Sequence, residues 1–410
     1  MIKKGLNIMR NVLLKQLEQV ALDEQPMEIT ERKGLGHPDT ICDSIMNQAS
    51  IELSKVYLER FGEILHHNLD KGLISAGGSQ VAFGGGKMTS PILIVYGDRA
   101  TYDVGSEHIP VDEITIKSTQ NWFKDNLRFV NPEEHLQHQV VIKQGAASLQ
   151  DIFSRKGKYL GANDTSAAVG FAPYSRSEQL IIDLERHLNS GEFKKSYPES
   201  GEDIKIMGFR NDNKLNLTVA MAFVDRYVES EGDYFRKKGE IHDAITEFLN
   251  SNYDFEQINV GLNVLDIKGR GLGGIYLTVL GTSADTGDSG QVGRGNNVVG
   301  VIPLNRPMSS EAAAGKNPVS HVGKIYNLLS YRIANQVYSC TNGIKEAYIW
   351  LVSAIGQPID DPAVLSAQVI LEKGTTIKDV QSDIDEAIAH EFEHLDEFCM
   401  DLATGKITVC

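Results

Sequence analysis

A glycine-rich segment over residues 281–297 contains the residue types that bind a phosphate group together with a metal ion. Its sequence, GTSADTGDSGQVGRGNN, follows an apolar stretch and joins five glycines to Asp285, Asp288 and Arg294. Small residues let backbone N–H groups approach an anion, and a carboxylate can hold Mg²⁺ beside it. The segment therefore predicts a phosphate-and-metal loop, although its composition is also typical of a flexible surface loop.

A second candidate site is the tetrapeptide Gly36-His37-Pro38-Asp39, which stands where a helix is expected to begin. Proline is favoured at the first helical position, and Ile41 and Ile45 share one face of the helix that would follow. The positive end of that helix, an imidazole and a carboxylate together would suit a polyphosphate with its Mg²⁺. For these four residues alone, a capping turn with an incidental histidine is the alternative.

The tetrapeptide Gly315-Lys316-Asn317-Pro318 similarly places a lysine just before an expected helix. It is not a nucleotide-binding P-loop, because residue 310 is a serine where that motif needs a glycine. In addition, Asn317 follows the lysine where the motif needs serine or threonine.

Two further motif matches lack the context that their chemistry needs. The segment 269–274, GRGLGG, fits the dinucleotide-binding fingerprint but precedes a predicted strand instead of following one and opening a helix. The segment 390–394, HEFEH, matches a zinc-protease pattern, but no histidine follows it and its neighbours are acidic. We therefore expect no Rossmann domain, and we interpret HEFEH as part of a solvated acidic helix face.

Positioning these residues requires a fold of the α+β or α/β class, because apolar periodicity predicts three rounds of helices and strand pairs. The expected helices begin at Pro38, cover 112–127 and 177–188, follow Pro318, and begin at Ile377. The expected strands cover 80–83, 91–97, 139–143, 203–209, 214–223, 258–264, 275–280, 347–354 and 366–371.

The same pattern predicts the division into domains. An amphipathic pattern after Met9 indicates a helix, so residues 1–27 are expected to form an N-terminal extension and helix. Three α+β domains are expected over residues 28–135, 136–256 and 257–410, with approximate limits and strand exchange between domains left open.

The composition limits the classes of function. The 410 residues are 41% hydrophobic and 23% charged, which is typical of a globular protein and excludes a disordered or collagen-like chain. With 40 basic and 55 acidic residues the net charge is −15, so we expect neither a nucleic-acid partner nor a membrane surface. Four widely separated cysteines indicate reduced thiols and a cytoplasmic protein, and no apolar run approaches the roughly 18 residues of a membrane span.

Five short segments, each weak alone, are highly specific in their order and spacing. They are residues 31–39 (ERKGLGHPD), 161–164 (GAND), 287–294 (GDSGQVGR), 315–318 (GKNP) and 354–358 (AIGQP). Together they resemble the S-adenosylmethionine synthetase (methionine adenosyltransferase) family, specifically its archaeal-type branch. The resemblance covers nearly the whole chain, from about Met9 onward.

The resemblance implies a fold and an assembly. In that family three similar α+β domains surround a quasi-threefold axis, and two subunits pack sheet to sheet with active sites at their interface. We expect that fold and a homodimer here, with higher oligomers left open. The three rounds of predicted elements agree with three domains, although no sequence repeat proves them.

The resemblance also implies a reaction between ATP and L-methionine. The methionine sulfur attacks C5′ of ATP and expels the triphosphate, which is then hydrolysed to phosphate and diphosphate. A neutral thioether loses no proton, so no general base is needed, and the motifs contain no nucleophile–base pair. The reaction instead needs cations and Mg²⁺ that align and neutralise the leaving group.

Carried over residue by residue, the resemblance assigns roles at the triphosphate. His37 would lie near the leaving oxygen, and Asp39 and Asp288 would bind Mg²⁺. The residues expected to hold phosphates are Gly287, Gly290, Arg294 and Lys316.

Three further residues would contact the substrates. Lys205, just before a predicted strand, corresponds to another polyphosphate-contacting lysine, and an exposed lysine at a strand start is the alternative. Asp164 would bind the methionine ammonium group, and Glu31 would line the nucleotide site.

The sequence departs from the bacterial and eukaryotic branch of the family beside two of these cations. Gly295 stands where that branch has a second basic residue after the phosphate-binding arginine, and Ser320 and Val322 stand where it has a lysine and an aspartate. Either His321 and Lys324 supply part of the missing charge, or the third phosphate and its metal are held differently.

The residue at position 87, Lys87, bears on whether the activity needs a monovalent cation. At this position the bacterial and eukaryotic branch carries an acidic residue that helps to bind an activating potassium ion. A lysine reverses the local charge, and its ammonium group could supply the positive charge that a bound K⁺ supplies in that branch. K⁺ is therefore a possible cofactor, but we expect the activity not to require it. A lysine that simply points to solvent is the alternative.

A noncatalytic, nucleotide-binding regulatory subunit of the same fold is the alternative function. Such subunits would be expected to lose charged residues at the site. This chain keeps the charged residues of the site, which favours catalysis: His37, Asp39, Asp164, Asp288, Arg294 and Lys316.

Overall fold

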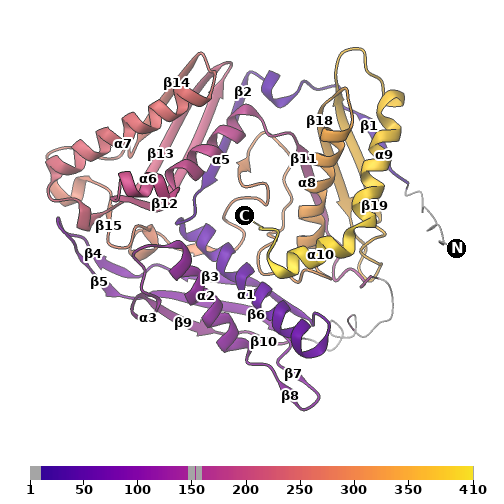
Figure 1. Ribbon diagram of the computed structural model, residues 1–410, viewed down its shortest axis with the longest axis horizontal. Helices are drawn as coiled ribbons and strands as arrows, with labels where there is room; N and C mark the ends of the chain where they lie inside the picture. The colour runs from indigo at the N-terminus through magenta and orange to yellow at the C-terminus, as the bar shows by residue number, and fades with distance from the viewer. Residues whose placement is uncertain (1–10, 146–152, 154–158, 410) are drawn as a thin grey trace.

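Three main sheets, each packed against helices, surround the middle of the molecule (Figure 1). This computed structural model describes residues 11–145, 153 and 159–409, so the first ten residues of the expected extension lie outside it. The helices and sheets confirm the α+β class. None of the described helices is long and apolar enough to cross a lipid bilayer.

The first sheet has the order β10-β6-β3-β16, with β9 beside β6. Its strands are β3 (His67–Ser75), β6 (Ile92–Ala100), β9 (Leu136–Val140), β10 (Lys143–Gln144) and β16 (Gly290–Gln291). It is accompanied by α1 (Pro38–Phe61), α2 (Val111–Asn126) and α3 (Pro132–His135). Ile41 and Ile45 of α1 pack with Ile94 and Tyr96 of β6 in a fully buried core, so α1 begins at Pro38 and uses the face that the sequence predicts.

The second sheet has the order β14-β13-β12-β2-β17, with β15 beside β13. Its strands are β2 (Met27–Lys33), β12 (Ser200–Asn211), β13 (Lys214–Val224), β14 (Gln257–Leu262), β15 (Leu277–Thr278) and β17 (Ile302–Pro303). Its helices are α5 (Arg176–Leu188), α6 (Gly191–Ser196) and α7 (Glu231–Asn252). Leu215, Leu217, Val219 and Met221 alternate along β13 into this core, as predicted.

The third sheet has the order β1-β19-β18-β11. Its strands are β1 (Leu13–Gln16), β11 (Ala167–Ala172), β18 (Ile344–Val352) and β19 (Val364–Leu371). Its helices are α8 (Val322–Cys340), α9 (Ile377–Glu393) and α10 (Leu395–Thr404). Two small hairpins complete the strands, β4 (Gly78–Gln80) with β5 (Lys87–Ser90) and β7 (Asp103–Val104) with β8 (Glu107–His108).

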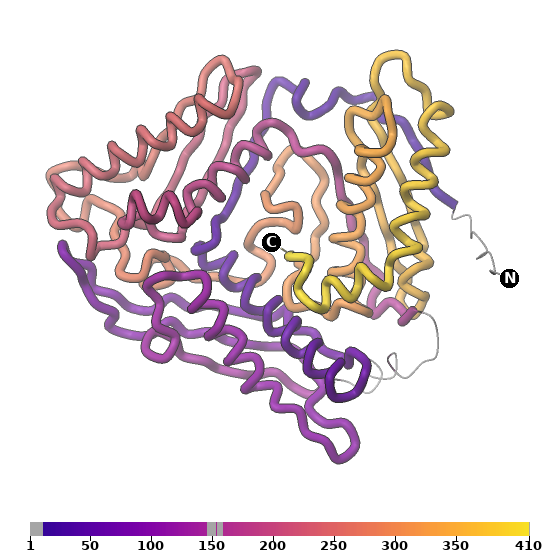
Figure 2. Tube along the Cα trace, viewed as in Figure 1, coloured from indigo at the N-terminus to yellow at the C-terminus, as the bar shows by residue number. Residues whose placement is uncertain are grey.

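Each main sheet takes strands from distant parts of the chain. β2 pairs with β12 in the second sheet, β11 pairs with β18 in the third, and β16 pairs with β3 in the first. The connection between β15 and α8 runs through the middle of the molecule, between the three sheets (Figure 2). The division into three domains with limits near residues 135 and 256 stays a proposal, as does the quasi-threefold axis.

The expected N-terminal helix is wrong. Leu13–Gln16 is a strand that pairs in parallel with Ser366–Val369 of β19, and only a short 3-10 turn, Leu22–Glu24, follows. Val12 and Leu14 pack against the third core, so the apolar side chains follow the period of a strand, not that of a helix. The strands expected over 80–83 and 275–280 are also shorter, since only residues up to 80 and residues 277–278 pair.

Candidate active site

His37 is the N-cap residue of α1 and is buried at the start of that helix. Its Nδ1 accepts a hydrogen bond from the Asp39 N–H at 3.2 Å, so we assign the proton of the neutral ring to Nε2. Burial lowers the pKa of His37, although the carboxylates of Asp203, Asp39 and Asp288 act in the opposite direction. A neutral imidazole in this position can donate one hydrogen bond from Nε2 to an anionic oxygen.

The glycine-rich segment lies against the first turn of α1. A Cβ at Gly290 would be 2.1 Å from the Pro38 carbonyl oxygen, so the close approach requires glycine. The Gln291 N–H donates to Asp39 Oδ1 at 2.9 Å. The two motifs predicted as phosphate sites, about 250 residues apart along the chain, therefore form one site.

Lys33, at the end of β2, contacts both the first turn of α1 and the glycine-rich segment. Its Nζ is 2.9 Å from Asp39 Oδ2 and donates to the Arg294 carbonyl oxygen at 2.5 Å. The Arg294 side chain is exposed, and no carboxylate in the described part of the chain forms an ion pair with it. This arginine is therefore available to an anionic ligand.

The two aspartates of the glycine-rich segment have different environments. Asp285 is buried and accepts the N–H groups of Val279 and Leu280 at 2.6 and 3.1 Å, and burial raises its pKa to about 6. Asp288 is exposed, and its Oδ1 accepts the Ser289 N–H at 2.8 Å. Asp285 therefore shapes the loop, whereas Asp288 presents its carboxylate to solvent, as a metal ligand would need to.

The glycines expected at the phosphates also differ from each other. The Gly287 N–H donates to the Ser283 carbonyl oxygen at 2.7 Å and is thus already used inside the loop. Gly290 serves the close contact with α1 described above. Both glycines therefore keep the loop compact beside His37.

Asp203, in β12, is a residue of this site that the sequence analysis missed. It is buried and accepts hydrogen bonds from the Ser283 N–H and hydroxyl group at 2.8 and 2.5 Å. Its charge acts to raise the pKa of His37, against the larger effect of burial, and burial raises the pKa of Asp203 itself. It lies two residues before Lys205 in the same strand, but its contact with Ser283, 80 residues later, leaves no local signal in the sequence.

Lys205 and Glu31 lie side by side on the second sheet. Lys205 Nζ is 3.1 Å from Glu31 Oε1, and the register places Lys205 between Lys33 of β2 and Ala220 of β13. Directly opposite residues share a sheet face. Lys205 and Glu31 are therefore on the same face as Lys33, which reaches Asp39.

Lys316 belongs to a second cluster, at the start of α8. Its ammonium group is buried, 2.8 Å from Glu311 Oε2 and 3.6 Å from Asp70 Oδ2. The Ser50 hydroxyl donates to the Lys316 carbonyl oxygen at 3.2 Å and bonds the His67 ring at 2.8 Å, which fixes the backbone of the lysine on α1.

The substitutions noted beside Lys316 also belong to this second cluster. His321 is the N-cap residue of α8, and burial together with the nearby Lys316 charge lowers its pKa to about 4. Lys324 is fully buried, its Nζ donates to Asn47 Oδ1 at 2.8 Å, and burial lowers its pKa to about 7. The Lys316 charge also acts to lower the pKa of Lys324, and burial keeps Lys324 from solvent.

Asp164 lies in the loop before β11, on the side of the second cluster. Its carboxylate is exposed and accepts only the Thr165 N–H, at 2.7 Å, among the described residues. The neighbouring Asn163 side chain accepts the Val322 N–H at the start of α8, at 3.3 Å. Part of the loop that precedes it, residues 154–158, lies outside the described residues.

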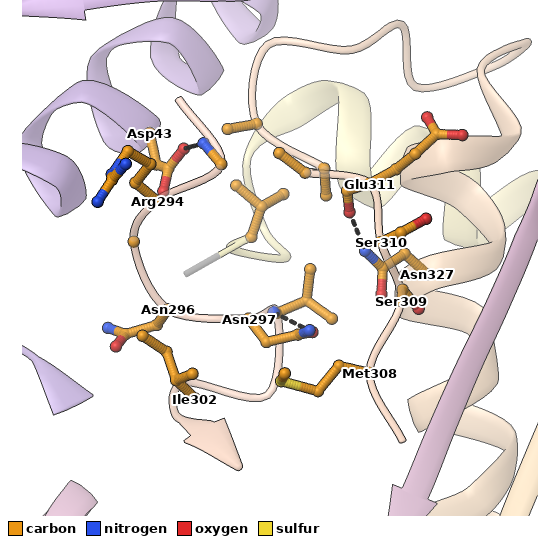
Figure 3. Close-up of a pocket in the computed structure, with 17 residues that line it drawn as sticks. Asp43, Arg294, Asn296, Asn297, Ile302, Met308, Ser309, Ser310, Glu311 and Asn327 are labelled. Carbon is orange, nitrogen blue, oxygen red and sulfur yellow. Dashed lines mark hydrogen bonds between the residues drawn. The ribbon is translucent and has the colours of Figure 1, made fainter. Parts of the chain in front are cut away.

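A cavity of about 210 Å³ lies between the two clusters (Figure 3). Asp43 and Arg294 line it on one side and Glu311 and Asn327 on the other. Asp43 accepts the Gly293 N–H at 2.9 Å, and burial raises its pKa to about 7. A Cβ at Gly295 would lie 2.3 Å from Asp43 Oδ2, so no side chain could replace this glycine without moving the aspartate.

The segments GRGLGG (269–274) and HEFEH (390–394) both make contacts with other side chains of the protein. The backbone N–H groups of Gly269, Arg270 and Gly271 all donate to Glu231 Oε1, so a carboxylate of the chain occupies this turn. Glu391 of the HEFEH segment is buried, with Oε2 in an ion pair with Arg332 and Oε1 3.5 Å from Nδ1 of the exposed His390.

Comparison with known proteins identifies the class of protein. A family model described as S-adenosylmethionine synthetase (AdoMet synthetase) matches residues 10–406, so the chain belongs to this family. The family resemblance inferred from the motifs is confirmed.

Full-length relatives agree with this. The chain is 42% identical to the S-adenosylmethionine synthase of Methanothermobacter marburgensis over 399 residues, which cover 97% of this chain and 99% of that protein. It is also 42% identical to that of Methanocaldococcus jannaschii over 407 residues, 98% of this chain and 100% of the relative. These archaeal relatives support the archaeal-type assignment.

A solved structure described as an unusual S-adenosylmethionine synthetase from Campylobacter jejuni is similar in fold. The TM-score is 0.57 with 16% identity, and the match covers 93% of this chain and 94% of that one. At this identity the likeness shows the fold alone.

Proposed function

We propose that this chain makes S-adenosylmethionine from ATP and L-methionine. The methionine sulfur would give an electron pair to C5′ of ATP, the C5′–O bond would break, and that bond's electrons would leave with the triphosphate. Water then cleaves the triphosphate to phosphate and diphosphate. The observation that carries the proposal is the junction of His37, Asp39 and the glycine-rich loop at the N-terminus of α1.

The residues of this junction suit a leaving triphosphate. His37 Nε2–H would donate to the departing oxygen, because Nδ1 is held by the Asp39 N–H. Arg294 and Lys205 would bind phosphate oxygens, and the partly positive first turn of α1 would add to their field. No residue has to accept a proton from sulfur, since the thioether carries none.

A divalent metal is a general requirement of the family, and we propose Mg²⁺ held by Asp39 and Asp288. No group of three or more His, Cys, Asp or Glu side chains gathers to hold a metal within the described residues. Mg²⁺ commonly takes one or two carboxylates and completes its shell with phosphates and water, so these two fit a metal that enters with ATP. When bound, it would neutralise charge on the leaving group.

A hollow beside the polar sheet face suits the nucleoside part of ATP. A cavity of about 550 Å³ with a largely apolar lining is bordered by Thr218 and Ala220 of β13 and by Tyr276. Ala220 is the direct neighbour of Lys205, and Thr218 that of Met207, which also pairs with Glu31. We propose that the base enters this hollow while Glu31 lines its phosphate side.

The same sheet face supports the proposed homodimer with active sites at its interface. Met27, Phe209 and Leu304 expose 45%, 39% and 55% of their surface, and Met27 and Phe209 share the face of Lys205. Apolar side chains around a substrate site are typical of a surface that another subunit covers.

We further propose that methionine binds through Asp164 and that the enzyme works in the cytoplasm.

One assay tests the proposal. The purified protein is incubated with ATP, methionine and Mg²⁺, and S-adenosylmethionine, phosphate and diphosphate are measured. We expect all three products in equal amounts. A folded protein that binds ATP but forms none of them would contradict the proposal and favour the noncatalytic regulatory subunit.

A further inference from the structure

Lys316, expected on the phosphates, is already held by carboxylates of the chain. Its Nζ is 2.8 Å from Glu311 Oε2 and 3.6 Å from Asp70 Oδ2. Burial acts to raise the pKa of Glu311, but hydrogen bonds from Lys316 and Ser166 lower it overall. Glu311 is therefore an anion that fixes the position of the lysine.

Glu311 has a second partner on its other oxygen. Its Oε1 accepts a hydrogen bond from the hydroxyl group of Ser166, two residues after Asp164. Ser166 N–H donates to Ser353 Oγ at 2.9 Å, and the Ser353 hydroxyl donates to the Asp164 carbonyl oxygen at 2.8 Å. One carboxylate thus joins Lys316 to the loop expected to bind methionine.

The surroundings of Glu311 hold both its backbone and its side chain. A Cβ at Gly323, the second residue of α8, would lie 2.3 Å from Glu311 Oε2, so glycine makes the space for the carboxylate. Asn327 Nδ2 donates to the Glu311 carbonyl oxygen at 3.0 Å, and Figure 3 shows the carboxylate pointing away from the cavity. Glu311 therefore lines the cavity with its backbone, while its side chain links α8 to its neighbours.

We propose that Glu311 is a positioning residue that couples the two substrates of the reaction: it holds Lys316 for the triphosphate and, through Ser166, holds the Asp164 loop for methionine. The inference rests on the proposed function, which assigns Lys316 and Asp164 to these substrates. Phosphate oxygens that reach Lys316 compete with Glu311 Oε2, so ATP alters the contact that orders the loop. Because binding coupling is reciprocal, methionine alters the phosphate side equally.

The test uses Glu311→Gln, Ser166→Ala, their double variant and Asp70→Asn as the matched control. Asp70 also faces Lys316, but its other partners in the described structure are Asn68, Lys71 and Asp98, away from the loop. Two quantities are measured for each folded variant: the methionine KM at saturating ATP, and the hydrolysis of added tripolyphosphate without methionine. Thermal unfolding checks that each variant is folded.

We expect Glu311→Gln and Ser166→Ala each to raise the methionine KM about tenfold, the scale of one lost charge-assisted hydrogen bond. The double variant should be no worse than either single one, because both remove the same link. Asp70→Asn should change tripolyphosphate hydrolysis and leave the methionine KM unaltered.

Additive effects of the two single variants would overturn the coupling, since additivity indicates separate local damage. An unchanged methionine KM in Glu311→Gln would overturn it as well. If Glu311→Gln does not fold, Ser166→Ala alone tests the proposal, because an unchanged methionine KM in that variant excludes the link between Glu311 and the Asp164 loop. In all these cases the wild type is active, whereas an inactive wild type would overturn the proposed function together with this inference.

Discussion

The clusters at the starts of α1 and α8 have the same type of helix cap, but they differ in how exposed and how paired their charged groups are. In both, a histidine caps the helix through Nδ1, which accepts the N–H two residues later: Asp39 at 3.2 Å for His37 and Gly323 at 3.1 Å for His321. Beside α1 the charged groups of Asp288 and Arg294 are exposed. Beside α8 the cations are buried and either paired or lowered in pKa.

The comparison indicates that the two clusters receive a ligand differently. The α1 cluster can accept an anion without breaking an existing ion pair of its arginine. In the α8 cluster, Lys316 must first exchange the carboxylate of Glu311 for a phosphate. This exchange costs the interaction energy of the ion pair, but it couples phosphate binding to the residues that Glu311 contacts. Substitution of the exposed Asp288 or Arg294 in the first cluster should therefore affect activity alone, whereas substitution of Lys316 in the second should affect activity together with stability.

The largest effect should come from Asp288→Asn in the exposed cluster. We expect the turnover number to fall on the order of 10²- to 10³-fold, because losing a metal ligand misplaces the leaving group. The melting temperature should stay unchanged, since the side chain is exposed and accepts a single N–H from its neighbour. Steady-state kinetics over a range of Mg²⁺ concentrations and thermal unfolding measure the two quantities.

Asp285→Ala is the matched control in the same loop. Its carboxylate accepts two buried N–H groups, so the variant should unfold more easily, by about 1–3 kcal/mol for the groups left unpaired. Full activity of Asp288→Asn, or of the wild type in excess chelator, would remove the metal role.

The second prediction compares Arg294→Met with Lys316→Met. Both should lower turnover by about 10- to 100-fold, because each removes a cation from the leaving group. Arg294→Met should leave the methionine KM nearly unchanged, whereas Lys316→Met should also raise it, because Glu311 loses the partner that fixes it beside the Asp164 loop. Only Lys316→Met should also lower stability, by about 1–3 kcal/mol, since it leaves the partly buried carboxylates of Glu311 and Asp70 without this partner. Urea unfolding separates the two cases, and equal stability losses would contradict the contrast between the clusters.

A smaller effect concerns the buried Lys324, whose pKa burial lowers to about 7. In the unfolded chain a lysine titrates near 10.4, so between about pH 7 and pH 10 the unfolded state binds more protons than the folded one. This group therefore makes stability rise as pH rises through that window and fall as pH falls toward 7.

Lys324→Met removes this dependence. The variant should melt higher than the wild type by a few degrees at about pH 7, and the difference should shrink toward about pH 10. Lys194, whose pKa burial also lowers to about 7, is present in both proteins and cancels in the comparison. A difference in melting temperature that does not vary with pH would contradict a titrating buried amine.

The parts of the fold that the sequence predicts are those with local signals. Pro38 marks the start of α1, and regular apolar spacing marks α5 and β13. The long helix α7 gives a weak apolar signal, because eight of its 22 residues are charged and it buries only Tyr234, Ile241, Ile245 and Leu249. β1 was taken for a helix because its partner, β19, lies some 350 residues away along the chain.

The same distinction applies to the site. His37, Asp39 and the glycine-rich loop could be recognised from composition and spacing. Asp203 could not, because its role depends on a contact with Ser283, 80 residues later, which local sequence does not reveal. The pairing of Lys316 with Glu311 was equally hidden, since a lysine near a helix start looks the same whether it faces solvent or a carboxylate.

The smallest expected effect concerns Lys87 and potassium. Lys87 begins β5, opposite Gln80 of β4, its side chain is exposed, and no described carboxylate forms an ion pair with it. A fixed ammonium can supply the charge that K⁺ supplies in relatives with an acid here, so KCl should raise wild-type activity less than about twofold over a tetraalkylammonium salt at equal ionic strength. If Lys87→Ala becomes dependent on K⁺ while the wild type is not, the lysine replaces the ion. Equal behaviour of both proteins would instead assign Lys87 to solvent, and strong, saturable K⁺ activation of the wild type would exclude the replacement, because an ammonium already in the site would repel a second cation.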